Sequence, residues 1–214
     1  HIRKTPLSAS KDLTVFVIDT EGISSLSASE DHDVKILSLA LLLSSSFLYN
    51  SVGAIDETAV QSLNLMTRVS EFVRVDADSE ATDSELSAFF PTFYWCLRDF
   101  SLRLESSDGR ACTEAEYLEA SLADDASGPV DDRNRTRRSI RDSFPNRSVV
   151  TLPRPAENTQ KLTRRTTGRK FTECVDALRT KIIREAKPLM VGENRPMTGS
   201  MFAHVCSNYT DALN

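Results

Sequence analysis

The sequence predicts an α/β fold with a mostly parallel sheet flanked by helices, and three observations support this prediction. Short apolar runs of the kind that form buried strands recur along the chain. Segments with apolar residues at a 3.6-residue period separate these runs. The length of 214 residues is enough for one sizeable α/β domain or two small ones. Because strands that alternate with helices favour parallel pairing, we expect a single sheet of this type.

The first expected strand, 13–18, ends in Asp19-Thr20-Glu21-Gly22. Ligands of open α/β sheets bind beyond the carboxyl ends of the strands. Asp19 could hold a water on Mg²⁺ there, and Gly22 could bring its backbone N–H against a terminal phosphate. This pattern is typical of nucleoside triphosphatases, although Asp-x-x-Gly after a strand also forms ordinary turns.

The next elements follow from periodicity and caps. A polar loop at 19–33 leads to a buried helix at 34–45, a strand at 46–51 and a turn at Gly53. Asp56 is expected to cap a helix that runs to about residue 75, before an acidic linker at 76–84.

The second half of the chain alternates in the same way. An aromatic strand is expected at 89–97, with Pro91 near its start, where a missing N–H is tolerated. Acidic residues open a short helix after Thr113. The remaining expected elements are a basic helix at 132–143, a strand at 148–152, an irregular segment at 153–169, and helices at 171–186 and 197–213. Four strands are few for this length, so we expect one or more sheet strands before residue 1.

The net charge of −5 hides a strong asymmetry. Residues 1–130 carry 9 basic and 22 acidic residues, whereas residues 131–170 carry 12 basic and 4 acidic ones. An anionic ligand, an anionic surface, or pairing with the acidic half could each account for the basic block, and we favour pairing. Nucleic acid is not expected as a partner, because the block lacks interleaved aromatic residues for base stacking.

Two further features concern the cellular setting. No apolar run approaches the length of a membrane span. The four cysteines show no Cys-x-x-Cys spacing, so we expect free thiols in a reducing compartment, the cytosol.

Arg98-Asp99 closes the third expected strand in the way that Asp19 closes the first. A carboxylate at Asp99 could accept parallel hydrogen bonds from guanine N1–H and the exocyclic amino group, which adenine cannot offer together. Such a site can discriminate by about 10⁴. A surface turn with a neighbouring ion pair is the alternative for the dipeptide alone. If both strands lie parallel in one sheet, Asp19 and Asp99 face the same ligand.

With these motifs in order, the chain resembles the guanylate-binding protein family, large GTPases related to atlastins and dynamins. The resemblance covers nearly the whole chain, and an Arg-Asp guanine motif replaces the usual Asn-Lys-x-Asp. The similar residues are Asp19-Thr20-Glu21-Gly22, Phe89-Phe90-Pro91, Trp95-Cys96-Leu97-Arg98-Asp99, Glu116-Tyr117-Leu118 and Leu152-Pro153-Arg154-Pro155.

The resemblance implies a role for each region. The segment 19–33 would be switch II, in which Asp19 orients the Mg²⁺ shell through water, Glu21 polarises a catalytic water and Gly22 senses the γ-phosphate. Arg98 and Asp99 would recognise guanine. The segment 153–170, with Leu152, Pro153 and Arg154 at its start, would form a guanine cap.

The resemblance also implies partners. GTP would be the substrate with Mg²⁺ as cofactor, and the cap would form a nucleotide-dependent homodimer. The intact protein would be cytoplasmic and could associate with membranes.

One departure from the family matters. No Gly-x-x-x-x-Gly-Lys-[Ser/Thr] phosphate loop occurs in residues 1–214. We therefore expect the chain to be the back two-thirds of a P-loop NTPase-type GTPase domain whose N-terminal strand and P-loop are missing. The rival hypothesis is a native protein without a P-loop, a pseudo-GTPase that acts as an interaction module for an active homologue.

Overall fold

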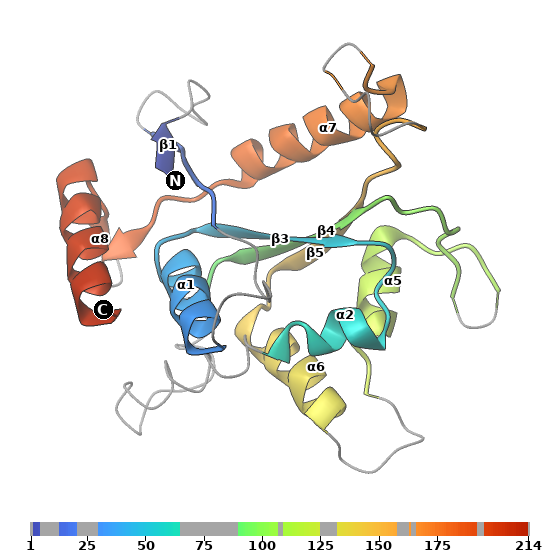
Figure 1. Cartoon of the computed structure of the whole chain (residues 1–214), viewed down its shortest axis with the longest axis horizontal. Coiled ribbons are helices and arrows are strands. Elements are labelled where there is room, and N and C mark those ends of the chain that lie inside the picture. Colours follow the sequence, from blue (N-terminus) through green and yellow to red (C-terminus); the bar gives the residue numbers. More distant parts are fainter. Residues whose placement is uncertain are drawn as a thin grey trace.

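The computed structural model describes residues 2–4, 13–20, 30–64, 90–106, 109–124, 132–157, 163, 166–191 and 195–213. A parallel sheet in the order β3-β4-β5 lies at its centre, formed by β3 (Ser46–Val52), β4 (Thr92–Arg98) and β5 (Arg147–Thr151). Helices cover both faces of this sheet (Figure 1). The predicted α/β class with a parallel sheet flanked by helices is therefore confirmed.

The side chains of β4 alternate between two hydrophobic layers. Phe93, Trp95 and Leu97 point into the larger cluster, whereas Cys96 belongs to the smaller one. The larger cluster is covered by α1 (Glu30–Leu42), α2 (Glu57–Gln61), α5 (Glu114–Ser121) and α6 (Asp132–Ser143). On the opposite face, α7 (Arg169–Glu185) packs Leu178 against Cys96 and Leu152. Helices thus bury both faces of β4, and as the middle strand it is also hydrogen-bonded on both edges.

Aromatic residues of β3 and β4 pack against the larger cluster. Trp95 is fully buried, and its indole N–H donates to the hydroxyl of Ser51 at 2.8 Å. Phe47 and Tyr49 are half-buried against the same cluster, with ring contacts to Phe93 and Trp95. Phe47, Tyr49 and Trp95 therefore serve in the packing of the sheet.

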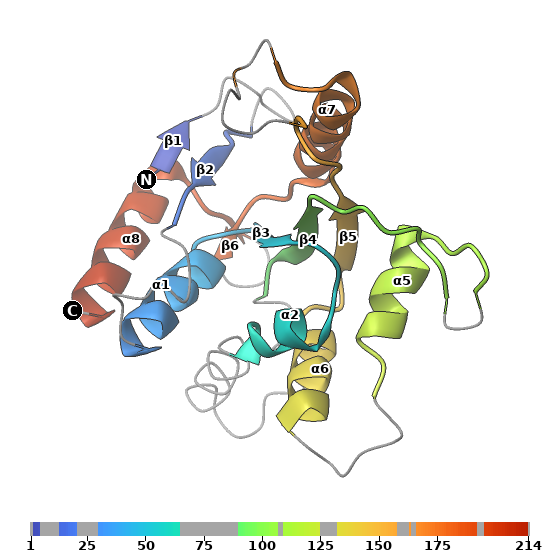
Figure 2. The same ribbon diagram turned by 45° about the vertical axis from the view of Figure 1, so that its right-hand side comes forward.

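The prediction of a buried parallel strand at 13–18 is wrong. The strand there is β2 (Phe16–Ile18), which pairs antiparallel with β1 (Ile2–Lys4) in a separate two-stranded sheet. Phe16 and Val17 are 41% and 53% exposed. The Phe16 ring stacks on Phe202 of α8 (Gly199–Leu213), and Figure 2 shows this pair of strands beside that helix. A short apolar run indicates a strand but does not determine which strand it pairs with.

Several element boundaries shift for local reasons. The helix predicted at 34–45 begins at Glu30, so the end of the expected polar loop is helical. The strand predicted from residue 89 begins at Thr92, directly after Pro91, which has no N–H to donate to a ladder. A small antiparallel pair, β6 (Met190–Val191) and β7 (Arg195–Pro196), was not predicted.

The predicted cap at Asp56 and several predicted helices are confirmed. The Asp56 carboxylate accepts from the N–H of Ala59 at 2.8 Å, which confirms the N-cap, and the described helix there spans Glu57–Gln61. The expected remainder to residue 75 and the linker 76–84 lie outside the described residues, apart from 62–64. Thr113 and Glu116 form a reciprocal capping box at the start of α5. The basic helix at 132–143 and the last helix, now α8, are also confirmed.

All four cysteines are free thiols, as expected. Of the helices within the described ranges, none is long and apolar enough to cross a membrane.

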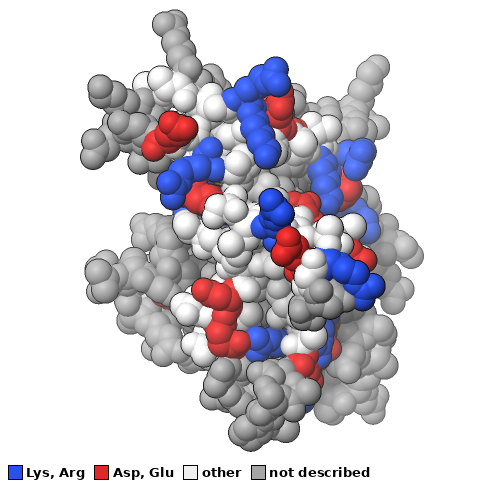
Figure 3. Space-filling model, turned by 90° about the vertical axis from the view of Figure 1, so that its right-hand side faces the viewer, with Lys and Arg blue, Asp and Glu red and all other residues white. Residues whose placement is uncertain are grey.

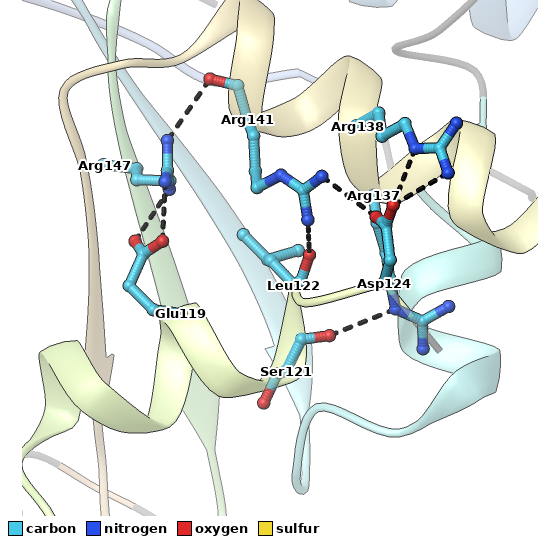
Figure 4. Close-up of polar contacts among 8 residues, drawn as sticks. All are labelled: Glu119, Ser121, Leu122, Asp124, Arg137, Arg138, Arg141 and Arg147. Carbon is cyan, nitrogen blue, oxygen red and sulfur yellow. Dashed lines mark hydrogen bonds and ion pairs between the residues drawn. The ribbon is translucent and has the colours of Figure 1, made fainter. Parts of the chain in front are cut away.

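The basic segment pairs with the acidic half of the chain, as predicted. Arg138 and Arg141 of α6 both contact Asp124, at 2.8 and 2.9 Å (Figure 4). Arg147 contacts Glu119 of α5 at 2.6 Å. The surface drawn in Figure 3 consequently shows blue and red side chains intermixed over the described residues rather than one basic field.

The buried member of this set is Arg137. Its guanidinium donates to both carboxylate oxygens of Glu57, at 3.1 and 2.6 Å, and to the carbonyl of Ser121 at 3.3 Å. The Arg137 side chain is 10% exposed, against 45% for Arg138. A two-point contact at a poorly solvated site contributes more to stability than a pair in water.

We expect Arg137→Ala to lower the free energy of unfolding by about 2–3 kcal/mol, because it removes three hydrogen bonds and leaves Glu57 and Ser121 without this donor. Arg138→Ala, one residue along the same helix, is the matched control and should cost under about 1 kcal/mol. Urea unfolding measures both. Equal losses would contradict the assigned importance of Arg137.

Candidate functional site

The Arg98-Asp99 pair lies at the carboxyl edge of the central sheet. β4 ends at Arg98, and Asp99 turns the chain with φ of 55°. Among the described residues other than glycine, Asp99 alone has a positive φ. Aspartate tolerates this left-handed conformation better than most residues, but it still costs free energy. Strain of this kind is concentrated at functional sites, so it supports the motif as a candidate site.

Neighbouring strands hold this turn on both sides. The N–H of Gly53, after β3, donates to the carbonyl of Arg98 at 2.7 Å. Gly53 has φ of 85°, which confirms the predicted turn and explains why a residue without Cβ stands there. On the other side, the N–H of Phe100 donates to the carbonyl of Leu152 at 3.0 Å, and that of Leu152 donates to the carbonyl of Leu97 at 2.8 Å.

These bonds bring the start of the predicted guanine cap beside the Arg-Asp motif. Leu152 is buried, Pro153 is half-buried and Arg154 is exposed. The carbonyl of Pro155 accepts from the N–H of Gly168 at 2.7 Å, so the segment returns to the start of α7. Much of the cap, residues 158–162 and 164–165, lies outside the described residues.

A cavity of about 540 Å³ opens at the same edge. Thr151 and Pro153 line it, but neither Arg98 nor Asp99 does, so it lies beside the motif rather than at it. The other lining residues are Phe100, Leu102, Arg103, Leu104, Glu105, Ala111, Lys170 and Cys174.

The phosphate-side motif is only partly visible. Asp19 follows β2 and is exposed, whereas Glu21 and Gly22 lie outside the described residues. Because β2 pairs with β1 and not with the central sheet, Asp19 and Asp99 do not end two parallel strands of one sheet, as the sequence had suggested. Within the described ranges, no group of three His, Cys, Asp or Glu side chains could hold a metal ion directly.

Two residues that support the edge were not predicted to do so. The Tyr117 hydroxyl accepts from the N–H of Ile55 at 3.0 Å, and the Glu114 carboxylate accepts from the N–H and hydroxyl of Thr151 at 2.8 and 2.9 Å. The sequence marks Tyr117 only as part of Glu116-Tyr117-Leu118. The acidic first turn of α5 was visible, but its long-range partner was not.

Comparisons with known proteins now bear on this geometry. A family model described as "Guanylate-binding protein, N-terminal domain" matches residues 2–187. The chain belongs to the guanylate-binding protein family.

Individual relatives agree with this assignment. Guanylate-binding protein 4 of Homo sapiens is 33% identical, with 94% of this chain and 33% of the relative covered. Guanylate-binding protein 7 of Homo sapiens is 32% identical over the same shares. Guanylate-binding protein 1 of Mus musculus is 38% identical, with 69% of this chain and 26% of the relative covered. The chain thus spans about a third of the length of the first two relatives and less of the third.

The strained turn gives a test of the site. Asp99→Gly should stabilise the native state relative to Asp99→Ala by about 1 kcal/mol, because glycine adopts the left-handed conformation without a Cβ clash. The two variants are matched, since each removes the carboxylate. Thermal unfolding checks the difference, and an alanine variant as stable as the glycine variant would show that Asp99 does not need this conformation.

Proposed function

We propose that this chain is the guanine-recognising part of a large GTPase of the guanylate-binding type, which binds and hydrolyses GTP. The observation that carries the proposal is the strained Arg98-Asp99 turn, held beside Leu152 and Pro153 at the carboxyl edge of a parallel sheet. Ligands of such sheets bind beyond this edge. The matched family and its relatives carry guanylate binding in their names.

Each residue of the base site has a distinct task. The Asp99 carboxylate accepts hydrogen bonds from guanine N1–H and the exocyclic amino group. Arg98 lies at the end of β4 and covers the base with its side chain. Leu152 anchors the start of the cap in the core against Cys96 and Leu178, and the half-buried Pro153 offers the apolar surface beside the motif. Arg154 is exposed at the start of the cap, where it can meet a second molecule. A nucleotide-dependent homodimer through the cap 153–170 is part of this proposal.

The hydrolytic side rests on the segment after β2. Asp19 would hold Mg²⁺ through a water molecule, Gly22 would contact the γ-phosphate and Glu21 would orient the attacking water. An exposed single carboxylate fits water-mediated contact with the ion, since a direct cage needs several oxygen ligands. When bound, Mg²⁺ neutralises the phosphate oxygens as charge develops in the transition state.

A phosphate loop is the part that residues 1–214 do not contain. The described strands leave the outer edge of β3 without a partner. One face of β3 lies on the same side of the sheet as α7. On that face, the side chains of Leu48 and Val52 are 42% and 60% exposed. An additional parallel strand and its helix would cover both features, and our proposal assigns them to sequence upstream of His1. The protein would work in the cytoplasm, with membrane association as a property of the intact molecule.

The lack of a phosphate loop within the chain favours one second candidate. The protein would be a pseudo-GTPase whose cap face binds an active homologue without hydrolysis of its own. The coding sequence upstream of His1 separates the two functions. A phosphate loop after a strand supports the GTPase, whereas a start codon without such a loop supports the interaction module, which cross-linking to an active relative would then test.

Asp99→Asn is expected to weaken GTP binding by about 10- to 100-fold and to raise the affinity for xanthosine triphosphate, because an amide can donate to the xanthine 2-oxo group. Titration of the native protein and of the variant with both nucleotides measures the change in the two affinities. Glu105→Gln, a similar change near the cavity, is the control and should leave the preference unchanged. An Asp99→Asn protein that still prefers guanine would contradict the proposed contact.

Residues 1–214 produced alone are expected to bind a fluorescent guanine nucleotide weakly or not at all at micromolar concentration. The phosphate contacts of a P-loop supply much of the affinity for a nucleoside triphosphate, and this segment has no such loop. Fluorescence anisotropy provides the measurement, and tight binding by this segment would sink the idea that the phosphate site needs further sequence.

A further inference from the structure

Helix α5 connects the carboxyl ends of all three strands of the central sheet. Tyr117 makes two of the connections, since its hydroxyl accepts from the N–H of Ile55, after β3, at 3.0 Å. Its ring meets that of Phe100, directly after the Arg98-Asp99 motif, edge to face at 5.9 Å. Figure 1 shows α5 standing beside the loops that leave these strand ends.

Glu114 makes the third connection, at the end of β5. One carboxylate oxygen accepts from both the N–H and the hydroxyl of Thr151, at 2.8 and 2.9 Å. β5 is the outer strand of the sheet, so an N–H that points away from β4 has no ladder partner among the described strands. Glu114 therefore holds the last residue of β5, directly before Leu152 and Pro153, together with the backbone bonds of Leu152.

The helix is itself fixed at both ends. At its start, Thr113 and Glu116 form the capping box, in which the Thr113 N–H donates to Glu116 at 2.7 Å. At its other end, Arg137 and Arg141 donate to the carbonyls of Ser121 and Leu122 (Figure 4). A cation near the last turn is favourable, because unpaired carbonyls make that end of a helix negative. These contacts hold both ends of α5 in place beside the strand ends.

We propose that Glu114 and Tyr117 are positioning residues that align the Asp99 carboxylate with the Watson–Crick edge of guanine. The inference rests on the proposed function and deepens it. Asp99 lies between Arg98, whose carbonyl is bonded to Gly53, and Phe100, which packs on Tyr117. A two-point contact to N1–H and the amino group tolerates little displacement, so movement of either flank weakens it.

Inosine triphosphate provides a readout that isolates this alignment, because hypoxanthine lacks the exocyclic amino group of guanine. The ratio of the two dissociation constants in the native protein reports the second hydrogen bond to Asp99. A general loss of structure lowers both affinities and leaves the ratio unchanged.

Tyr117→Phe retains the ring against Phe100 and removes the acceptor for the Ile55 N–H. Glu114→Ala removes the acceptor for the Thr151 N–H, whereas Glu114→Gln keeps a carbonyl oxygen that can accept from the same N–H. We expect Tyr117→Phe and Glu114→Ala to reduce the preference for GTP over inosine triphosphate by about tenfold, the equivalent of one weakened hydrogen bond to a charged group. Glu114→Gln should restore most of the preference.

Glu119→Gln is the matched control on the same helix, since Glu119 bonds Arg147 at the start of β5, away from the carboxyl end of that strand. It should lower thermal stability without a change in the ratio. Equal losses of both affinities in Tyr117→Phe and Glu114→Ala, with the ratio unchanged, would overturn the inference. An unmodified native protein that binds neither nucleotide would overturn the proposed function, and the inference with it.

Discussion

Burial of β4 on both faces is the constraint on which the rest of this structure depends. Phe93, Trp95 and Leu97 pack into the cluster formed with α1, α2, α5 and α6, and Cys96 packs beneath α7. A strand buried in this way needs a hydrogen-bonded neighbour on each edge, because unpaired backbone groups away from water are costly. β3 and β5 supply these partners in parallel, and that direction brings all three carboxyl ends to one edge.

The candidate site is a consequence of that arrangement. Once Arg98 ends the central strand, the loops after β3 and β5 lie on either side of Asp99 and bond to its flanks. The left-handed backbone at Asp99 persists because these bonds over-determine it. The same arrangement explains the basic segment, whose arginines hold the far end of α5 while Glu114 and Tyr117 hold the strand ends. Four arginines of the basic segment, Arg137, Arg138, Arg141 and Arg147, pair with acidic residues within the fold, the alternative that the sequence favoured.

The two candidate motifs follow strands of different sheets. Arg98 ends β4 of the central sheet, with Asp99 directly after it, whereas Asp19 follows a strand of the small antiparallel sheet that packs beside α8. On the outer side of the central sheet, Leu48 and Val52 of β3 are exposed, and no described strand pairs with the outer edge of β3.

Local chemistry determined much of this protein from sequence alone. Period-3.6 spacing located α1, the Asp56 cap located α2, the acidic first turn after Thr113 located α5, and the aromatic run located β4 within three residues. Such features predict well because each depends on neighbours a few residues away. The Arg98-Asp99 motif and the family resemblance were visible for the same reason.

Only the tertiary structure decided the long-range relations. The run at Phe16–Ile18 did not reveal that its partner would be Ile2–Lys4. The sequence does not reveal that the acidic residue Glu114 binds Thr151, 37 positions away. Nor does it reveal which acidic residues the basic segment contacts. Pairing across such distances depends on which faces the core brings together, and that information is spread over the whole chain rather than carried by any one motif.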